Sequence, residues 1–202
     1  MRCGYFDDQA REYVITDPRT PVKWINYVGT LAFGGFVDHT GGALLCRGDP
    51  ATDRITRYLA LQPASDFKGT TLYLRTGVTG LCTVSSPFYV PTLEPLDVFE
   101  CHVGLGYTRI ISSRDGLQTT ATFFVPRNDT RLVIDVRIAN LGAATLELRW
   151  SRAARMRFSE TGPSVPRVWA KRLTRSSSSI QRTSATSAPE RRAGGRAATA
   201  SR

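Results

Sequence analysis

The chain has 202 residues and a formal net charge of +10, and its length suits one ordinary domain with a core of its own. Residues 1–150 carry 15 Lys and Arg against 15 Asp and Glu, whereas residues 151–202 carry 12 against 2. All the excess positive charge therefore lies in the last quarter of the chain. The neutral first part gives no indication of a fold that binds polyanions.

The first 150 residues are predicted to form consecutive short strands. β-Branched and aromatic residues occur there in short runs that Gly, Pro, Asp and Asn separate, which is typical of strands and turns. Gly4–Asp8 is predicted as a short turn before the first run. The predicted strands are Tyr13–Thr16, Trp24–Val28, Leu31–Val37, Arg57–Leu61, Thr71–Arg75, Val98–His102, Tyr107–Ser112, Leu117–Val125, Arg131–Ala139 and Thr145–Trp150.

The clearest predicted hairpin spans Tyr107–Val125. Its arms meet at Asp115-Gly116, and this pair favours a tight turn because glycine accepts a positive φ without steric cost. The next predicted strand has an apolar face formed by Leu132, Ile134, Val136 and Ile138. No stretch of helical length shows a 3.6-residue apolar repeat, so the fold class is predicted as all-β, an antiparallel β-sandwich.

The composition changes abruptly after Trp150. Residues 151–202 are dominated by Arg, Ser, Ala, Thr, Pro and Gly, and their few apolar side chains bury too little area to offset the cost of backbone ordering, roughly 1–2 kcal/mol per residue. We therefore predict two parts, a β-sandwich at residues 1–150 and a disordered basic tail at residues 151–202.

The cysteines and the lack of long apolar runs indicate the compartment. Cys3, Cys46, Cys82 and Cys101 form no C-x-x-C pair and match no metal-binding spacing. The sequence shows no charged-then-apolar leader and no apolar run of about 20 residues. Free thiols, a cytoplasmic location, no membrane span and no metal site are the resulting expectations.

Six short motifs, in order and at compatible spacing, resemble the amino-terminal region of the glycoside hydrolase family 94 phosphorylases, the cellobiose phosphorylase type. The match begins at the opening residues and reaches about Trp150. The motifs are the opening (Gly4–Asp8, Arg11–Thr16 and Trp24–Gly29), His39–Gly42, Asp49–Pro50 with Arg54–Tyr58, Thr71–Arg75, Glu100–Thr108 and Phe123–Pro126.

This resemblance implies an incomplete β-supersandwich, which in the family precedes a helical linker and an (α/α)6 barrel. Family members cleave a β-glucosidic bond with inorganic phosphate and invert the anomeric carbon; a barrel carboxylate is the general acid, and no metal or organic cofactor is used. The expected partners are a β-linked gluco-oligosaccharide, the missing barrel and, in the parent enzyme, a second copy in a homodimer. The chain alone is expected to hold no catalytic residue and to be inactive.

Two departures from the family pattern stand out. Ala43–Cys46 replaces an aromatic-serine-aromatic strand, and a tryptophan expected near Ser85–Phe88 is missing, which indicates a subgroup other than the best-known cellobiose enzymes. Phe158-Ser159-Glu160-Thr161 stands where the family has Phe-Gln-Arg. The codons TTT TCA GAG ACN, read one base later, encode Phe-Gln-Arg, so we predict a change of reading frame just before Phe158, which the nucleotide sequence tests.

Candidate sugar-contacting residues combine aromatic rings with hydrogen-bonding groups. The candidates are Trp24, Asn26, Tyr27, Tyr73 and Arg75. Their alternative role is packing of the sandwich core and of the surface that faces the missing barrel. His39 and His102 have no metal-spaced partner and are interpreted as structural residues, and Cys101 and His102 point to opposite faces of one strand.

Two other functions stay open. The chain is alternatively a free-standing carbohydrate-binding or interaction sandwich, which titration with oligosaccharides would reveal. Non-specific nucleic-acid binding through the Arg-rich tail would weaken steeply with salt. No specific nucleic-acid partner is expected. Sheet edges left without their family partners are expected to cause self-association.

Overall fold

The structure, a computed structural model, describes residues 3–59, 61, 63–78, 81–143, 146–154 and 176–180. All regular elements in these ranges are strands, and every pair of neighbouring strands is antiparallel. The prediction of an all-β antiparallel sandwich is therefore confirmed.

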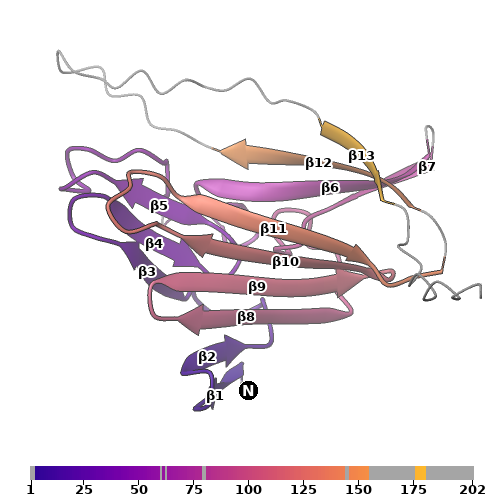
Figure 1. The fold of residues 1–202 in the computed structure, drawn as a ribbon, viewed down its shortest axis with the longest axis horizontal. Coiled ribbons are helices and arrows are strands. Elements are labelled where there is room, and N and C mark those ends of the chain that lie inside the picture. Colours follow the sequence, from indigo (N-terminus) through magenta and orange to yellow (C-terminus); the bar gives the residue numbers. More distant parts are fainter. Residues whose placement is uncertain are drawn as a thin grey trace, which may run out of the picture.

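The strands form three sheets (Figure 1). The six-stranded sheet has the order β1 (Gly4–Asp7), β2 (Glu12–Ile15), β8 (Val98–Gly104), β9 (Tyr107–Arg114), β10 (Leu117–Phe124) and β11 (Val133–Asn140). The four-stranded sheet has the order β13 (Ser176–Ile180), β12 (Leu146–Ala154), β6 (Thr70–Val78) and β7 (Leu81–Ser85). The three-stranded sheet has the order β3 (Ile25–Gly29), β4 (Gly34–Asp38) and β5 (Ala43–Cys46).

One hydrophobic core joins the three sheets. It contains Phe123 and Ile110 from the six-stranded sheet, Leu74 from the four-stranded sheet and Val37 from the three-stranded sheet, all nearly inaccessible to solvent. The two smaller sheets therefore share the inner face of the large sheet, which is the layered arrangement that an alternating apolar pattern requires.

The predicted hairpin and its alternation are confirmed. Asp115 and Gly116 both have positive φ, 51° and 76°, and β9 pairs with β10 directly across this two-residue turn. Such turns match the right-handed twist of the flanking strands. Every second residue of β10 from Leu117 to Phe123 is buried, and the predicted apolar face of β11 packs against the core.

Several element predictions were wrong. Gly4–Asp7, predicted within a turn, is strand β1, and β5 and β7 were not predicted. Arg57–Leu59 is not a strand, although the residues around it contact β5 through a bridge between Cys46 and Arg54, backbone hydrogen bonds, the Thr56 hydroxyl and the Tyr58 ring. The predicted strand Leu31–Val37 begins later, at Gly34, since Leu31 is 94% exposed in the preceding turn.

The predicted tail is described only in part. The predicted domain boundary at Trp150 falls inside β12, which continues to Ala154, and Ser176–Ile180 forms β13 beside β12. Residues 155–175 and 181–202 lie outside the described residues, so the prediction of disorder for them stays a prediction.

Candidate functional site

Three of the predicted sugar-contacting residues lie on or next to β3, and their surroundings differ. Trp24 is partly buried against the core. The Asn26 Nδ2 group donates to the backbone oxygens of Gly104 (2.9 Å) and Tyr107 (2.8 Å), which fastens β3 to the β8–β9 hairpin. Tyr27 is 72% exposed. The contacts of Trp24 and Asn26 are structural, whereas the Tyr27 ring is open to a ligand.

The other two candidates lie on β6. Leu72 and Leu74 of this strand are buried in the core, so Tyr73 and Arg75, which alternate with them, face away from it on the outer side of the four-stranded sheet. β3 and β6 belong to different sheets (Figure 1), so the five candidates come from two sheets. Direct sugar contact by any of them stays a prediction.

His39 is a buried structural residue. Its Nδ1 accepts from the backbone N–H of Trp24 (3.2 Å), and its Nε2 lies 3.0 Å from both the Thr20 hydroxyl and the Pro18 carbonyl. The Thr20 hydroxyl donates to the Val22 carbonyl, so the His39 Nε2–H is the donor in this group. Burial lowers the pKa of His39, and the neutral ring satisfies every contact.

A network of charged and polar side chains centres on Glu12 of β2, whose side chain is 2% exposed. Its carboxylate accepts from His102 Nδ1 at 2.7 Å, from Arg109 Nη2 at 2.9 and 3.0 Å, and from the Tyr107 hydroxyl. The other ring nitrogen of His102 lies 3.2 Å from Glu100 Oε2. The network joins β2, β8 and β9 on the outer face of the large sheet.

The missing side chain of Gly104 makes this network possible. A Cβ atom at Gly104 would lie 2.3 Å from the Tyr107 ring, so only glycine lets this ring cross β8 towards Glu12. Burial raises the pKa of Glu12, but hydrogen bonds from Tyr107 and His102 and the charge of Arg109 outweigh it and lower this pKa below its ordinary value. An ionised, fully bonded carboxylate does not suit general acid catalysis, and Glu12 is a structural clamp.

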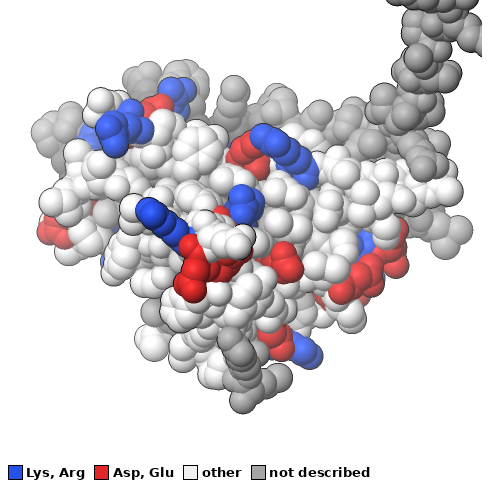
Figure 2. Space-filling view, turned by 60° about the horizontal axis from the view of Figure 1, so that its bottom comes forward, with Lys and Arg blue, Asp and Glu red and all other residues white. Residues whose placement is uncertain are grey.

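Figure 2 shows small mixed groups of acidic and basic residues and no broad patch of one sign. In the described part of the chain, no cluster of His, Cys, Asp and Glu is arranged to hold a metal ion, and no helix is long and apolar enough to cross a membrane.

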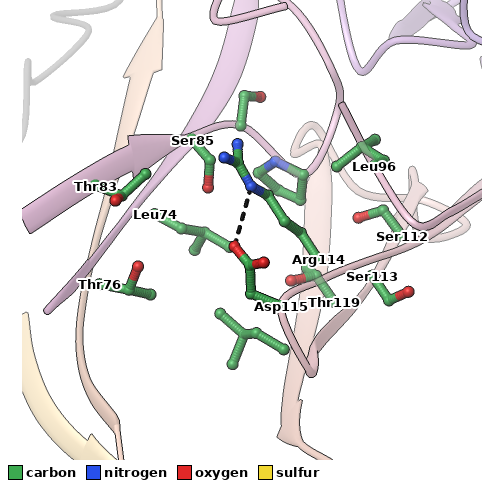
Figure 3. A pocket seen from close by; sticks show the side chains of 13 residues that line it. Leu74, Thr76, Thr83, Ser85, Leu96, Ser112, Ser113, Arg114, Asp115 and Thr119 are labelled. Atoms are coloured by element: carbon green, nitrogen blue, oxygen red, sulfur yellow. Dashed lines mark hydrogen bonds and ion pairs between the residues drawn. The ribbon is translucent and has the colours of Figure 1, made fainter. Parts of the chain in front are cut away.

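A cleft of about 70 Å³ opens between the large sheet and the β6–β7 hairpin, next to the turn between β9 and β10 (Figure 3). Leucine side chains such as Leu74 and Leu96 form its apolar wall. Its polar wall consists of hydroxyl groups from four strands and one loop. These hydroxyls belong to Thr76, Thr83, Ser85, Ser86, Ser112, Ser113 and Thr119.

Ser112 and Thr119 distinguish this cleft from an ordinary surface hollow. They are direct partners in the β9–β10 register, and each residue is 2% exposed. Neither hydroxyl makes a side-chain hydrogen bond within the described residues. Neither oxygen is among the fully buried side-chain atoms without a partner, so both hydroxyls are accessible to water or to a hydroxylated ligand in the cleft.

Arg114 sets the charge of the cleft. Its Nε lies 3.3 Å from Asp115 Oδ2, as Figure 3 shows, and its Nη1 lies 3.1 Å from Glu94 Oε2. Two carboxylates therefore offset the guanidinium charge, and the cleft suits a neutral hydroxylated group better than an anion. Its volume is well below the roughly 300–1,000 Å³ of sites that enclose a whole ligand, so only one edge of a sugar fits.

The comparison with known families decides the identity of the domain. The family described as "Glycosyl hydrolase 94, supersandwich domain" matches residues 11–177. The chain belongs to this family. The resemblance of its motifs is thereby confirmed, and the supersandwich match extends past Phe158, the position before which a change of reading frame is predicted.

Relatives of this supersandwich domain are much longer proteins. The N,N'-diacetylchitobiose phosphorylase of Vibrio furnissii is 35% identical over 144 residues, which is 69% of this chain and 17% of that enzyme. The 3-O-beta-D-glucopyranosyl-beta-D-glucuronide phosphorylase of Paenibacillus borealis is 32% identical over 139 residues, 69% of this chain and 16% of that enzyme. The chain thus spans less than a fifth of the length of either relative.

Neither the Glu12 network nor the hydroxyl-lined cleft of the supersandwich is predictable from the sequence motifs. Glu12 and Arg109 are 97 positions apart, and only the β2–β8–β9 strand order brings them together. The one usable signal for the cleft was the alternation of β10, which places Thr119 on the buried face between Leu117 and Ala121.

Proposed function

We propose that this chain is the non-catalytic supersandwich part of a glycoside phosphorylase, an enzyme that splits a β-linked disaccharide with inorganic phosphate to give a sugar 1-phosphate. The observation that carries the proposal is the family match across residues 11–177, together with relatives named as phosphorylases. The catalytic barrel, a homodimeric parent enzyme and a cytoplasmic location are parts of the same proposal. The free thiols of the described cysteines support the last of these.

The direct test is an assay for phosphorolysis. The purified chain, incubated with inorganic phosphate and either N,N'-diacetylchitobiose or cellobiose, is expected to release no sugar 1-phosphate, because the described residues offer no general acid in a site that accommodates a disaccharide. The Vibrio furnissii enzyme serves as the positive control with N,N'-diacetylchitobiose. Release of sugar 1-phosphate above the protein-free blank would refute the proposal.

The hydroxyl-lined cleft favours a second candidate function, that of a carbohydrate-binding sandwich. A pyranose edge inserted between Leu74 and Leu96 would place its hydroxyls beside those of Ser112 and Thr119. Hydrogen bonds between neutral groups stabilise a complex by about 0.5–1.5 kcal/mol each, so such a site would bind weakly, with a dissociation constant in the millimolar range (~1 mM).

Calorimetric titration with chito- and cello-oligosaccharides tests this candidate. Binding should weaken about tenfold or more in the double variant Ser112→Ala/Thr119→Val, which removes both unpaired hydroxyls. The matched control is Thr120→Val, because Thr120 is the next residue of β10 and points to the opposite face. Absence of heat at high oligosaccharide concentration, or equal affinities for the double variant and the wild type, would contradict sugar binding in the cleft.

A further inference from the structure

Two arginines lie directly opposite each other on the outer face of the four-stranded sheet. In the register between β6 and β12, Arg75 is the partner of Arg149. Leu74 of β6 and Leu148 of β12 are buried in the core, so the arginines that follow them face away from it, and both are exposed. β6 and β12 are the two central strands of this sheet (Figure 1), and the pair therefore lies within the sheet and not at its edge.

The two arginines repel each other. The Cβ atoms of directly opposite residues are about 4.5–5.5 Å apart, and like charges at such positions destabilise a sheet. Among the described residues, no carboxylate forms an ion pair with Arg75. Arg149 takes part in a further interaction, but its guanidinium carries five N–H donors, more than one partner uses. An anion bound by both guanidinium groups would offset their repulsion.

The charge and the donors of this pair suit a phosphate group. Each guanidinium is a planar fork that binds two oxygens at once, so two of them accommodate three or more acceptor oxygens. A phosphate monoester has three terminal oxygens and a charge of about −1.5 to −2 at pH 7, which matches two positive charges. A carboxylate has two oxygens and one charge, and it therefore satisfies only one arginine. Tyr73, two residues before Arg75 on the same face of β6, adds an aromatic ring beside the pair.

This arginine pair is separate from the hydroxyl-lined cleft. Leu74 and Thr76 line the cleft from one face of β6, and Arg75 between them points to the other face. We propose that Arg75 and Arg149 form a binding site for a phosphate group, carried by inorganic phosphate or by a small phosphate monoester. The inference rests on the register between β6 and β12, and it depends neither on the proposed function nor on sugar binding in the cleft.

Phosphorus NMR titration of the full chain with inorganic phosphate at low ionic strength tests the proposal. The wild type should bind phosphate. Arg75→Gln and Arg149→Gln should each raise the dissociation constant about tenfold, because each removes charge-assisted hydrogen bonds to the anion. Arg152→Gln is the matched control, since it removes the same charge from β12, but Arg152 stands opposite Leu72 and faces away from the pair. This control should bind phosphate as tightly as the wild type.

The control also decides against binding by net charge alone. All these variants retain the basic residues of the last quarter of the chain, which attract phosphate without a defined site. If Arg75→Gln and Arg152→Gln weakened binding equally, or if neither did, phosphate would be an adventitious ion only and the proposal would be overturned. Arg75→Lys keeps the charge but loses the fork, so it should also bind phosphate more weakly than the wild type.

Thermal unfolding gives a second readout that does not depend on the titration. Without phosphate and at low salt, Arg75→Gln should melt at a higher temperature than the wild type, because the repulsion between the two arginines is gone. Added phosphate should raise the melting temperature of the wild type more than that of Arg75→Gln. A variant that melts below the wild type without phosphate, and gains as much from its addition, would contradict the proposal.

Inorganic phosphate, glucose 1-phosphate and acetate are the probes that identify the ligand. Equal dissociation constants for the first two would identify free phosphate as sufficient, and tighter binding of glucose 1-phosphate would identify a monoester whose organic part lies on Tyr73. Acetate should bind more weakly than either, since it offers one charge and two oxygens. Acetate binding as tight as that of phosphate would refute a site built for a phosphate group.

Discussion

Glu12→Gln is expected to lower the free energy of unfolding by about 2–4 kcal/mol, because it leaves Arg109 and His102 without the carboxylate that they surround. Removing one partner of a fully buried ion pair costs roughly 3–5 kcal/mol, and the estimate for Glu12 is smaller because the Arg109 side chain is 35% exposed. Chemical denaturation of the wild type and the variant at neutral pH measures the difference.

The same substitution should make the free energy of unfolding depend less on pH in the acidic range. The pKa of Glu12 is lowered in the folded protein, so the folded state holds this proton less tightly than the unfolded chain does. The stabilisation is complete above the ordinary pKa of 4.5 and is lost as the pH falls from there through the lowered folded value. In Glu12→Gln this contribution is absent, and the unfolding free energy should fall less steeply over that acidic range.

Glu100→Gln is the matched control for both measurements. Glu100 touches the same histidine, but through one contact of 3.2 Å, and its side chain is 37% exposed. An exposed ion pair contributes about 0–1 kcal/mol to stability, so the free energy of unfolding of Glu100→Gln should stay close to that of the wild type. If Glu12→Gln lowered the free energy of unfolding as little as Glu100→Gln, Glu12 would not be the residue that holds the β1–β2 hairpin to the rest of the large sheet.

The parts of the fold that the sequence predicted are those with local patterns. The Asp115-Gly116 turn and the alternation of β10 depend on residues close together in the chain, and both were predicted correctly. β5 was not predicted, since its four residues are all buried and show no alternation. Gly4–Asp7 has no strong strand pattern of its own, and pairing with β2 makes it a strand.

The side-chain clusters depended on tertiary structure and could not be predicted. Asn26 is a candidate sugar-contacting residue by its residue type, with packing as the alternative, and only the structure shows that its amide donates to two backbone carbonyls on the neighbouring hairpin. The hydroxyls of Ser112 and Thr119 look unremarkable in the sequence. They become a candidate site only because the β6–β7 hairpin packs over them and leaves a cleft.

Asp38→Ala is expected to destabilise the domain by about 4 kcal/mol or more, since unsatisfied buried donors cost roughly 1–3 kcal/mol each. Asp38 is completely buried at the end of β4. Its Oδ1 accepts from the Thr40 backbone N–H and hydroxyl, both at 2.8 Å, and from the Gly42 N–H at 3.0 Å. Its Oδ2 accepts from the Tyr58 hydroxyl at 3.1 Å. Alanine leaves all these donors without an acceptor.

The arrangement also explains Gly42 of the His39–Gly42 motif. A Cβ atom at Gly42 would lie 2.4 Å from Asp38 Oδ2, so the turn and the carboxylate fit together only with glycine at this position. Burial lowers the pKa of Lys23, and the nearby negative charge of Asp38 partly offsets that effect. Asp38→Ala therefore also removes the charge that favours a protonated Lys23, which adds to the loss of stability.

Comparing the thermal unfolding of Asp38→Ala with that of Asp53→Ala shows how much of the lost stability comes from the burial of the carboxylate. Asp53 contacts Arg47 at 2.8 Å, but both side chains are about half exposed, so Asp53→Ala should change the unfolding free energy by less than about 1 kcal/mol. Tyr58→Phe removes only one of the donors to Asp38, so its loss of unfolding free energy should lie between those of Asp53→Ala and Asp38→Ala. Equal melting temperatures for Asp38→Ala and Asp53→Ala would show that the turn after β4 does not depend on this carboxylate.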